Sequence, residues 1–369
     1  MTRPAGIAAI VGFLLLSAAA PRCAVSGARL VGDLARQGQR PLLDLPGIDA
    51  EYGAVQTQAG ARLRTIVTKP AGRAGRLPAV LFVPWLSCDS VDFSATSDDG
   101  WSLMLKQLIT QSNMLWLRVD KSGVGDSTGV PCEKLDYETE LSQYRAAYTA
   151  LTERADVDAG HVVIFGGSMG ATYAPLIAAG QKVAGVVVWG GGATTWFERM
   201  LAFERHALEL KGTDPARLSP EMTARARYFA RYLLQGESPE TIARSDPELG
   251  KVWPSLVGTS GLLHYGRPLA FHQQAQRQDW PAAWAQVKAP VLALYGEYDW
   301  FESRDAVRLI ADVVNRERPG SAEFRELPGL NHHFTRFPSR VAAYQEQGGV
   351  ADPSEFVRIV LDWLHRLPR

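Results

Sequence analysis

A serine stands between glycines in the sequence GGSMG, residues 166–170, directly after the apolar run HVVIF. The segment ATYAPLIAAG follows and has the pattern of a helix. A G-x-S-x-G sequence between strand and helix holds its serine in a strained turn, and the glycines remove side-chain atoms that would clash there. The hydroxyl is then exposed beside the N-terminal amides of the helix, which favour developing negative charge. Ser168 is therefore the candidate nucleophile.

A serine hydroxyl is a weak nucleophile, so it needs a base, and the base needs an acid to orient it. The chain has seven histidines. His161 precedes the strand that leads to Ser168, so it should lie at the far end of the sheet. Four others lie in predicted helical segments: His206, His264, His272 and His365. His332 and His333, in LPGLNHHF, instead follow a predicted strand. Asp299, in LYGEYDWF, also follows a strand and is the candidate acid. Either histidine meets the general requirement for a base.

Strands and helices must alternate to bring these residues to one edge of a sheet. A hairpin is predicted over 54–72, and apolar runs typical of buried strands are followed by helical patterns. This alternation predicts a mostly parallel α/β sheet with helices on both faces. The predicted strands are 77–85, 113–120, 161–165, 182–192, 289–299 and 321–329, and the predicted helices are 100–111, 136–154, 304–317 and 354–367.

The alternation stops between residues 194 and 286, where helical periodicity continues without a convincing strand. We interpret this segment as a helical lid inserted between residues 51–193 and 287–369, the two parts of the α/β core. Such a lid would cover the carboxyl edge of the sheet, where α/β sheets bind ligands. Its aromatic residues could line a substrate pocket or pack in a core. They are Trp196, Phe197, Phe203, Trp253, Phe271 and Trp280.

The N-terminus differs in composition from the rest of the chain. Residues 1–24 begin with Arg3, run apolar from Ile7 to Leu16 and end in small residues, as a secretory signal does. An uncleaved anchor is the alternative, although the apolar stretch is short for a membrane span. We therefore expect a secreted, periplasmic or cell-envelope protein, in which residues 25–50 form a linker or irregular strap.

Composition excludes several classes of partner. Lysine plus arginine and aspartate plus glutamate both number 39, so no charge excess favours nucleic acid or an anionic membrane. The sequence holds no phosphate loop, Rossmann glycine pattern or metal-ligand cluster, so we expect neither cofactor nor metal. A small molecule is the expected partner, and no membrane insertion is expected beyond the signal. In an exported protein Cys88 and Cys132 could form a disulfide or remain buried thiols.

The mature chain resembles the α/β-hydrolase superfamily, in its esterase and serine aminopeptidase-like branch. The resemblance rests on GGSMG, APVLALYGEYD, LPGLNHHF and RVDKSGVGDSTG, and on the order Ser168, Asp299, His332. It implies the α/β-hydrolase fold, with an eight-stranded type of sheet. In relatives the base lies three residues after the glycine of the last loop, which from Gly329 gives His332 and leaves His333 as the alternative.

The resemblance also implies an oxyanion hole and a disulfide. The hole would use the backbone amide of Met169 and one from the loop after the third strand, where Pro84-Trp85-Leu86 replaces the usual His-Gly. This departure favours the Leu86 amide, with Trp85 as the alternative. Because the third and fourth strands are neighbours in the fold, Cys88 and Cys132 would form a disulfide that pins this loop.

The expected function is a serine hydrolase that cleaves a carboxylic ester through an acyl-enzyme. A peptidase of the aminopeptidase or prolyl-oligopeptidase-like type is the first alternative, in which Glu198 or Glu204 would bind the substrate amine. We favour a solvated helix face for both carboxylates, because surface carboxylates are the rule. A non-catalytic protein that binds a ligand is the second alternative, because Pro84-Trp85-Leu86 replaces the usual His-Gly in the loop expected to hold an oxyanion donor. This loop, after the third strand of the family fold, is called the oxyanion loop below.

Overall fold

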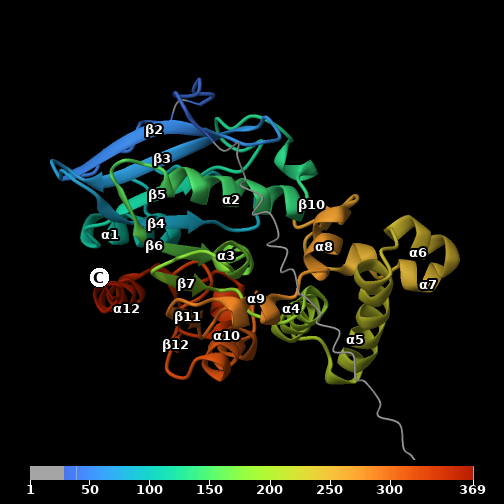
Figure 1. Ribbon diagram of the computed structural model, residues 1–369. Coiled ribbons are helices and arrows are strands. Elements are labelled where there is room, and N and C mark those ends of the chain that lie inside the picture. Colours follow the sequence, from blue (N-terminus) through green and yellow to red (C-terminus); the bar gives the residue numbers. More distant parts are fainter. Residues whose placement is uncertain (1–28, 39, 369) are drawn as a thin grey trace, which may run out of the picture.

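The computed structural model describes residues 29–38 and 40–368 (Figure 1). The predicted signal, residues 1–24, and the start of the predicted strap lie outside these ranges. In the described part of the chain, no helix combines the length and apolar character that crossing a membrane requires.

A sheet of nine strands forms the centre of the molecule, with its strands adjacent in the order β1-β2-β3-β5-β4-β6-β7-β11-β12 (Figure 1). This is one strand more than the eight-stranded type expected, and the short β1 lies at one edge. Neighbouring strands are antiparallel from β1 to β5 in this order. From β5 to β12, neighbouring strands are parallel. This confirms the mostly parallel sheet. The strands are β1 (Arg29–Val31), β2 (Ile48–Gln56), β3 (Arg62–Pro70), β4 (Leu77–Val83), β5 (Leu115–Val119), β6 (Val157–Gly167), β7 (Gly185–Trp189), β11 (Val291–Gly296) and β12 (Ala322–Leu327).

Helices cover both faces of the sheet, which explains why its inner strands are apolar throughout. One face packs against α1 (Gly100–Gln111) and α12 (Ser354–His365). The other packs against α2 (Tyr137–Thr152), α3 (Gly170–Ala178) and α10 (Arg304–Glu317). The fully buried strands β5, β7 and β11 lie between these two layers. The expectation of helices on both faces is confirmed.

The predicted strap contains more regular structure than its composition indicates. β1 pairs with β2, and β2 already begins at Ile48, inside the segment expected to be irregular. Leu34, Leu43 and Leu45 are buried against the sheet, so this segment is part of the hydrophobic core. Its short β1 and isolated buried leucines produce no alternating pattern that sequence analysis could detect.

Between β7 and β11 the chain forms a separate group of helices, called the insertion below, which protrudes beside the sheet (Figure 1). It also holds a small antiparallel sheet, β10-β9-β8, which differs from the strand-free prediction. Each of these strands has two residues, too few to show a period in the sequence. The elements are α4 (Trp196–Leu210), α5 (Pro215–Phe229), α6 (Pro239–Ser245), α7 (Pro247–Gly250), β8 (Thr259–Ser260), β9 (Leu263–His264), β10 (Arg267–Pro268), α8 (Leu269–Gln276) and α9 (Trp280–Gln286).

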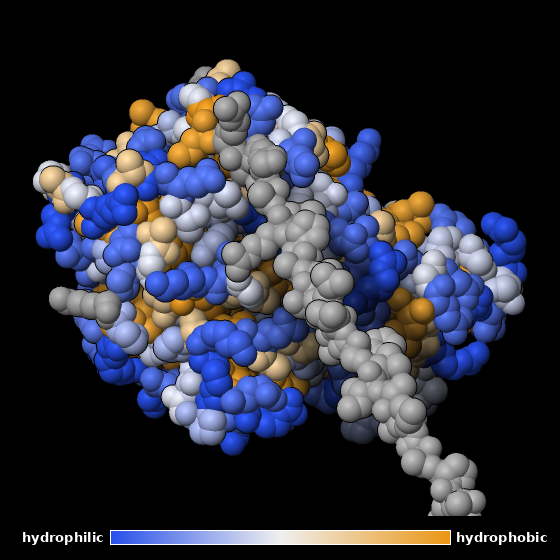
Figure 2. All heavy atoms as spheres, viewed as in Figure 1, coloured by the Kyte–Doolittle hydropathy of each residue, from blue (hydrophilic) through white to orange (hydrophobic). Residues whose placement is uncertain are grey.

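The surface of the insertion is mixed, with hydrophobic patches among hydrophilic side chains (Figure 2). Its exposed apolar residues include Leu234 and Leu262. Three further elements lie between β12 and α12 in the sequence: β13 (Thr335–Arg336), α11 (Arg340–Tyr344) and β14 (Val350–Ala351).

A buried histidine in the insertion makes its stability sensitive to acid. His272 accepts a hydrogen bond from the Trp196 indole at 3.2 Å and donates one to the His264 carbonyl at 2.8 Å. Burial lowers the pKa of His272 to about 3. The unfolded histidine takes up a proton below a pH of about 6.5. Above that pH, His272 does not lower the free energy of unfolding. As the pH falls from there towards the pKa of the folded state, protonation of the unfolded chain lowers the free energy of unfolding.

We predict that lowering the pH from 7 to 5 reduces the free energy of unfolding by about 2 kcal/mol through His272. Burial also lowers the pKa of His264 and of His333, so the contribution of His272 is measured as the difference between wild-type and variant protein in denaturant unfolding at the two pH values. The matched variant is His272→Gln, which keeps an acceptor for Trp196 but has no proton to gain, and it should lose less stability than the wild-type protein. An equal loss in both proteins contradicts the prediction.

Candidate active site

The turn after β6 holds Ser168 in a strained conformation. Its φ is 55°, in the left-handed region that residues other than glycine rarely adopt. The Ser168 amide donates to the Trp189 carbonyl at 2.7 Å, which ties the turn to β7. A side chain at Gly170 would clash with the Val83 carbonyl, and one at Gly166 would clash with the backbone at Gly170. The glycines of the sequence are thus required for this close approach of β4, β6 and α3.

His332 connects Ser168 to Asp299. The Ser168 hydroxyl lies 2.9 Å from His332 Nε2, and His332 Nδ1 lies 2.6 Å from Asp299 Oδ2. Asp299 is fully buried and only 5% of His332 is exposed, so little water competes for these hydrogen bonds. With the carboxylate ionised, Nδ1 carries the proton and donates to Asp299, and Nε2 is free to accept the serine proton. The three residues follow the ends of β6, β11 and β12.

The backbone after Asp299 fixes the orientation of its carboxylate. The amides of Phe301 and Glu302 donate to Oδ1 at 2.8 and 3.1 Å. Oδ2 is left to accept from His332. The Asp299 side chain therefore bonds to donors on both oxygens, as a buried carboxylate requires.

His333, the alternative base, lies beside the site but outside this hydrogen-bonded series. It lines the same cavity as Ser168, and its ring lies 5.6 Å from that of Phe301. Burial lowers the pKa of His333 to about 4. Its backbone amide donates to Asn331. Of the two neighbouring histidines, the structure brings only His332 into contact with Ser168 and Asp299.

The expected oxyanion residues border the cavity next to Ser168. Leu86 and Met169 both line it, as does Trp85. Within the described residues, the backbone amides of Trp85, Leu86 and Met169 are not engaged in hydrogen bonds. Met169 also precedes the first residue of α3, where helix amides attract negative charge. These amides are thus free to donate to a ligand.

A buried lysine holds the loop after β4. The ammonium group of Lys121 donates to the Trp85 carbonyl at 2.6 Å and to the Ser87 carbonyl at 3.1 Å. It lies 3.2 Å from the Glu140 carboxylate. Burial, followed by the charge of Arg267, lowers the pKa of Lys121 well below its usual value. Sequence analysis missed Lys121, since its partners come from distant segments and no spacing reveals them.

The predicted disulfide is present next to this lysine. Cys88 and Cys132 are bonded, with Cα atoms 5.8 Å apart. Arg267, from β10 of the insertion, donates to the Cys132 carbonyl at 2.9 Å and also pairs with Glu140. The disulfide therefore joins the loop after β4 to the segment after β5, and Arg267 connects both to the insertion.

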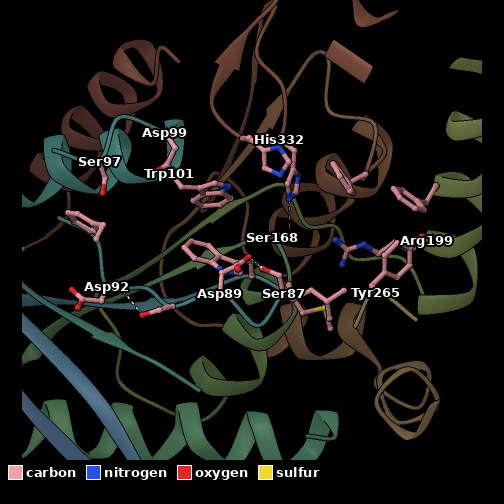
Figure 3. A pocket seen from close by; sticks show the side chains of 18 of the residues that line it. Ser87, Asp89, Asp92, Ser97, Asp99, Trp101, Ser168, Arg199, Tyr265 and His332 are labelled. Atoms are coloured by element: carbon pink, nitrogen blue, oxygen red, sulfur yellow. Dashed lines mark hydrogen bonds between the residues drawn. The ribbon is translucent and has the colours of Figure 1, made fainter. Parts of the chain in front are cut away.

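A cavity of about 610 Å³ opens at Ser168 and His332 (Figure 3). One end contains the acidic residues Asp89, Asp92 and Asp99, together with Trp101 (Figure 3) and Arg40. The other end is mostly aromatic. It is formed by Trp196, Arg199, Met200, Phe203, Tyr265 and Phe301. Ser168 and His332 lie between the two ends (Figure 3).

The aromatic residues predicted in the insertion divide between pocket and core. Trp196 and Phe203 line the cavity, whereas Trp253, Phe271 and Trp280 are buried elsewhere. Phe197 is partly buried and packs against the core. Sequence analysis missed Arg199. Its signal is the helical spacing i, i+3, i+4, i+7 of Trp196, Arg199, Met200 and Phe203, which places one arginine on an otherwise apolar face.

The two carboxylates considered as amine ligands have structural partners and do not line the cavity. Glu198 accepts from the backbone and the hydroxyl of Thr195, in a capping box at the start of α4. Glu204 is buried, 2.9 Å from Arg225, and accepts from the Val257 amide at 2.8 Å. Glu198 is exposed on α4, as the solvated-face interpretation expects, whereas that interpretation is wrong for the buried Glu204.

The described residues contain no group of three or more histidine, cysteine or acidic side chains that could hold a metal ion. A hydrogen-bonded serine, histidine and aspartate can instead perform nucleophilic catalysis without a cofactor.

Comparisons with known proteins identify the family and the fold. A sequence model described as the alpha/beta hydrolase family matches residues 80–344. The structure is similar to the alpha/beta hydrolase GrgF from Penicillium sp. sh18, with 16% identity, a TM-score of 0.52, and 86% of this chain and 99% of that chain covered. It is also similar to carboxyl esterase 2 from Tuber melanosporum, with 13% identity, a TM-score of 0.52, and 89% and 91% covered. A search of curated proteins gives no match.

Proposed function

Because the chain belongs to the alpha/beta hydrolase family, we propose that it is a serine hydrolase that cleaves carboxylic esters through an acyl-enzyme. The observation that carries this proposal is the hydrogen-bonded series from the Ser168 hydroxyl through His332 to Asp299. A nucleophile, a base and an orienting acid are the three groups that acyl transfer by serine requires.

In the first half of the reaction, Ser168 Oγ attacks the carbonyl carbon of the ester while His332 Nε2 takes its proton. Asp299 stabilises the imidazolium. The tetrahedral intermediate then collapses, the bond to the alcohol breaks, and His332 returns the proton to the leaving oxygen. In the second half, water attacks the acyl-enzyme with His332 again as base, which releases the acid and restores the serine.

Two backbone amides would stabilise the negative charge of the tetrahedral intermediate. Met169 and Leu86 are the proposed donors, because their amides make no hydrogen bond to residues that the structure describes and both residues line the cavity beside Ser168. Donors that are fixed before the reaction avoid the cost of reorganisation. The contacts of Lys121 with the carbonyls of Trp85 and Ser87 support a role in orienting the Leu86 amide.

An ester is the proposed substrate rather than a peptide with a free amine. Glu198 and Glu204, the carboxylates first considered as amine ligands, are occupied by structural partners. Asp89, Asp92 and Asp99 line the cavity, so they are the carboxylates that would bind an amine in the peptidase alternative. The cavity also offers an aromatic end that suits an apolar group.

We also propose that the insertion, residues 194–286, acts as a lid over the sheet edge, since α4 contributes side chains to the cavity.

A comparison of matched chromogenic substrates tests the reaction type. We expect the protein to release p-nitrophenol from p-nitrophenyl butyrate with a kcat/KM well above that for the p-nitroanilide of alanine. Preferential cleavage of the anilide would favour the peptidase. Absence of turnover on both substrates, together with saturable ligand binding, would favour the non-catalytic alternative.

Export remains our proposal for the location of the protein. The Cys88–Cys132 disulfide supports it, because disulfides persist in oxidising compartments and are rare in the cytosol. Determination of the N-terminal residue of protein recovered from cell fractions tests both the location and the cleavage of residues 1–24.

The effect of Lys121 on the oxyanion loop gives a further prediction. Replacement by methionine keeps the apolar stem but removes the donor to the Trp85 and Ser87 carbonyls, so the Leu86 amide loses its fixed direction. We predict a fall in kcat of about 10- to 100-fold with little change in KM, since oxyanion contacts act mainly in the transition state.

The matched control for this variant is Glu140→Gln, which alters the same buried cluster without removing a contact to the loop. Its kcat should change less than that of Lys121→Met. If KM rises and kcat is unchanged in Lys121→Met, the lysine does not position an oxyanion donor.

A further inference from the structure

One arginine stands out in the aromatic end of the cavity. Arg199 lies on the face of α4 that also carries Trp196, Met200 and Phe203, and only 7% of it is exposed. Figure 3 shows its guanidinium directed towards the space beside Ser168 and His332. A charged group at this position is costly to bury unless a partner satisfies it.

Only some of the nitrogens of the Arg199 guanidinium have hydrogen-bond partners among the described residues. Nε lies 3.0 Å from Glu302, and Nη2 reaches the Gly190 carbonyl at 3.4 Å. Nη1 is buried and has no hydrogen-bond partner within the described residues. Gly190 also lies against the ring of His332, so the guanidinium is close to the reacting groups.

Glu302 accounts for the Nε donor but not for the rest of the guanidinium. Its Oε2 also accepts from the Gly192 amide at 2.9 Å, and its Oε1 accepts from the Ser303 amide at 2.9 Å. The carboxylate is therefore bonded on both oxygens. The ion pair through Nε fixes the position of Arg199. The guanidinium nitrogen Nη1 remains available to donate to a ligand.

A second unpartnered donor lies at the same end of the cavity. Tyr265, between β9 and β10, has a φ of 51°, and its buried hydroxyl makes no hydrogen bond in the described part of the chain. Burial, followed by the charge of Glu204, raises the pKa of Tyr265, and the charge of Arg199 acts in the opposite direction. In Figure 3 the two residues lie together on the same side of Ser168. A neutral tyrosine hydroxyl and a guanidinium are suited to bind carboxylate oxygens.

The charges of the cavity are separated in a way that orients an anion. Asp89, Asp92 and Asp99 line the opposite end, where they outnumber one cation, Arg40, whose guanidinium donates to the Asp92 carbonyl. A negative group would still be repelled at that end. The insertion supplies both unpartnered donors at the other end. An anionic group on the substrate is therefore favoured next to Arg199 and disfavoured at the acidic end.

We propose that Arg199 and Tyr265 form a carboxylate-binding subsite, and that the substrates are esters carrying a carboxylate in addition to the scissile group. This inference rests on the proposed ester hydrolysis and specifies its substrate class. A guanidinium that pairs with a carboxylate also gives selectivity against uncharged analogues, whose binding would leave the buried donors unpaired.

The test compares acid and neutral versions of the same esters. The first pair is the mono-p-nitrophenyl ester of adipic acid and its methyl ester, which place the charge on the acyl side. The second pair is 4-(butyryloxy)benzoic acid and its methyl ester, which place the charge on the leaving group. We expect the acid of at least one pair to have a kcat/KM about 10- to 100-fold above that of its neutral partner.

Variants assign this preference to the subsite. Arg199→Met and Tyr265→Phe should each lower the ratio of acid to neutral kcat/KM. Arg225→Met is the matched control, because it also removes a buried, ion-paired arginine of the insertion but one that does not line the cavity. Its ratio should remain that of the wild-type protein.

The outcomes separate this inference from the proposed function. Hydrolysis of the neutral esters with no preference for either acid overturns the subsite and leaves ester hydrolysis standing. If no ester is hydrolysed, calorimetric titration of adipate decides the subsite independently. Binding that weakens at least tenfold in Arg199→Met but not in Arg225→Met supports it, and equal or absent binding overturns it.

Discussion

Replacement of Ser168 by alanine is expected to lower kcat for ester hydrolysis by about 10⁴- to 10⁶-fold. The variant loses only the oxygen that attacks the substrate, while His332 and Asp299 keep their mutual hydrogen bond. Without the nucleophile no acyl-enzyme can form, and binding and oxyanion contacts give only the small residual rate. Steady-state hydrolysis of p-nitrophenyl butyrate measures the loss.

The control for this variant is Ser97→Ala, a serine that lines the same cavity and whose hydroxyl bonds to Ser94. It should change kcat by less than about tenfold, as is usual for groups outside the reacting set. A melting temperature close to that of the wild-type protein shows that Ser168→Ala is folded. Activity retained in folded Ser168→Ala would refute the assignment of the nucleophile.

The two neighbouring histidines give the second prediction. His332→Ala should lower kcat by about 10⁴-fold or more, since the serine then lacks its base. His333→Ala should lower it far less, because His333 lies at the cavity wall without contact to Ser168 or Asp299. The comparison uses adjacent residues of the same type, so general effects of removing an imidazole cancel.

Both histidine variants should be measured with the same ester over a range of pH. The expected result is a large loss for His332→Ala at every pH and a nearly unchanged profile for His333→Ala. A larger loss in His333→Ala would show that the histidines exchange roles in solution. The hydrogen-bonded arrangement of the structure would then not be the reactive one.

The candidate site could be predicted to a large extent from the sequence, for a physical reason. Carboxyl ends of parallel strands meet at one edge of a sheet. Ser168, Asp299 and His332 each follow such an end, so their proximity follows from the strand pattern without any knowledge of side-chain contacts. The glycines around Ser168 predicted the tight turn that holds the serine. Only residues without side chains fit there between β4, β6 and α3.

The groups that support the site could not be predicted in this way. Lys121 acts on carbonyls more than thirty residues away in sequence, and such contacts have no local signature. Arg199 has a local signature in its helical face, but its meaning depends on where α4 lies over the sheet. The short strands β8, β9 and β10 escaped detection because two residues define no period.

Covalent labelling by a fluorophosphonate tests the central claim most directly. The reagent phosphonylates an activated serine, and peptide mass spectrometry identifies the modified residue. The arrangement of Ser168, His332 and Asp299 predicts one stable adduct on the peptide that contains Ser168, with labelling strongly reduced in His332→Ala. An adduct on another serine, or an unmodified Ser168 in protein that hydrolyses esters, would contradict it.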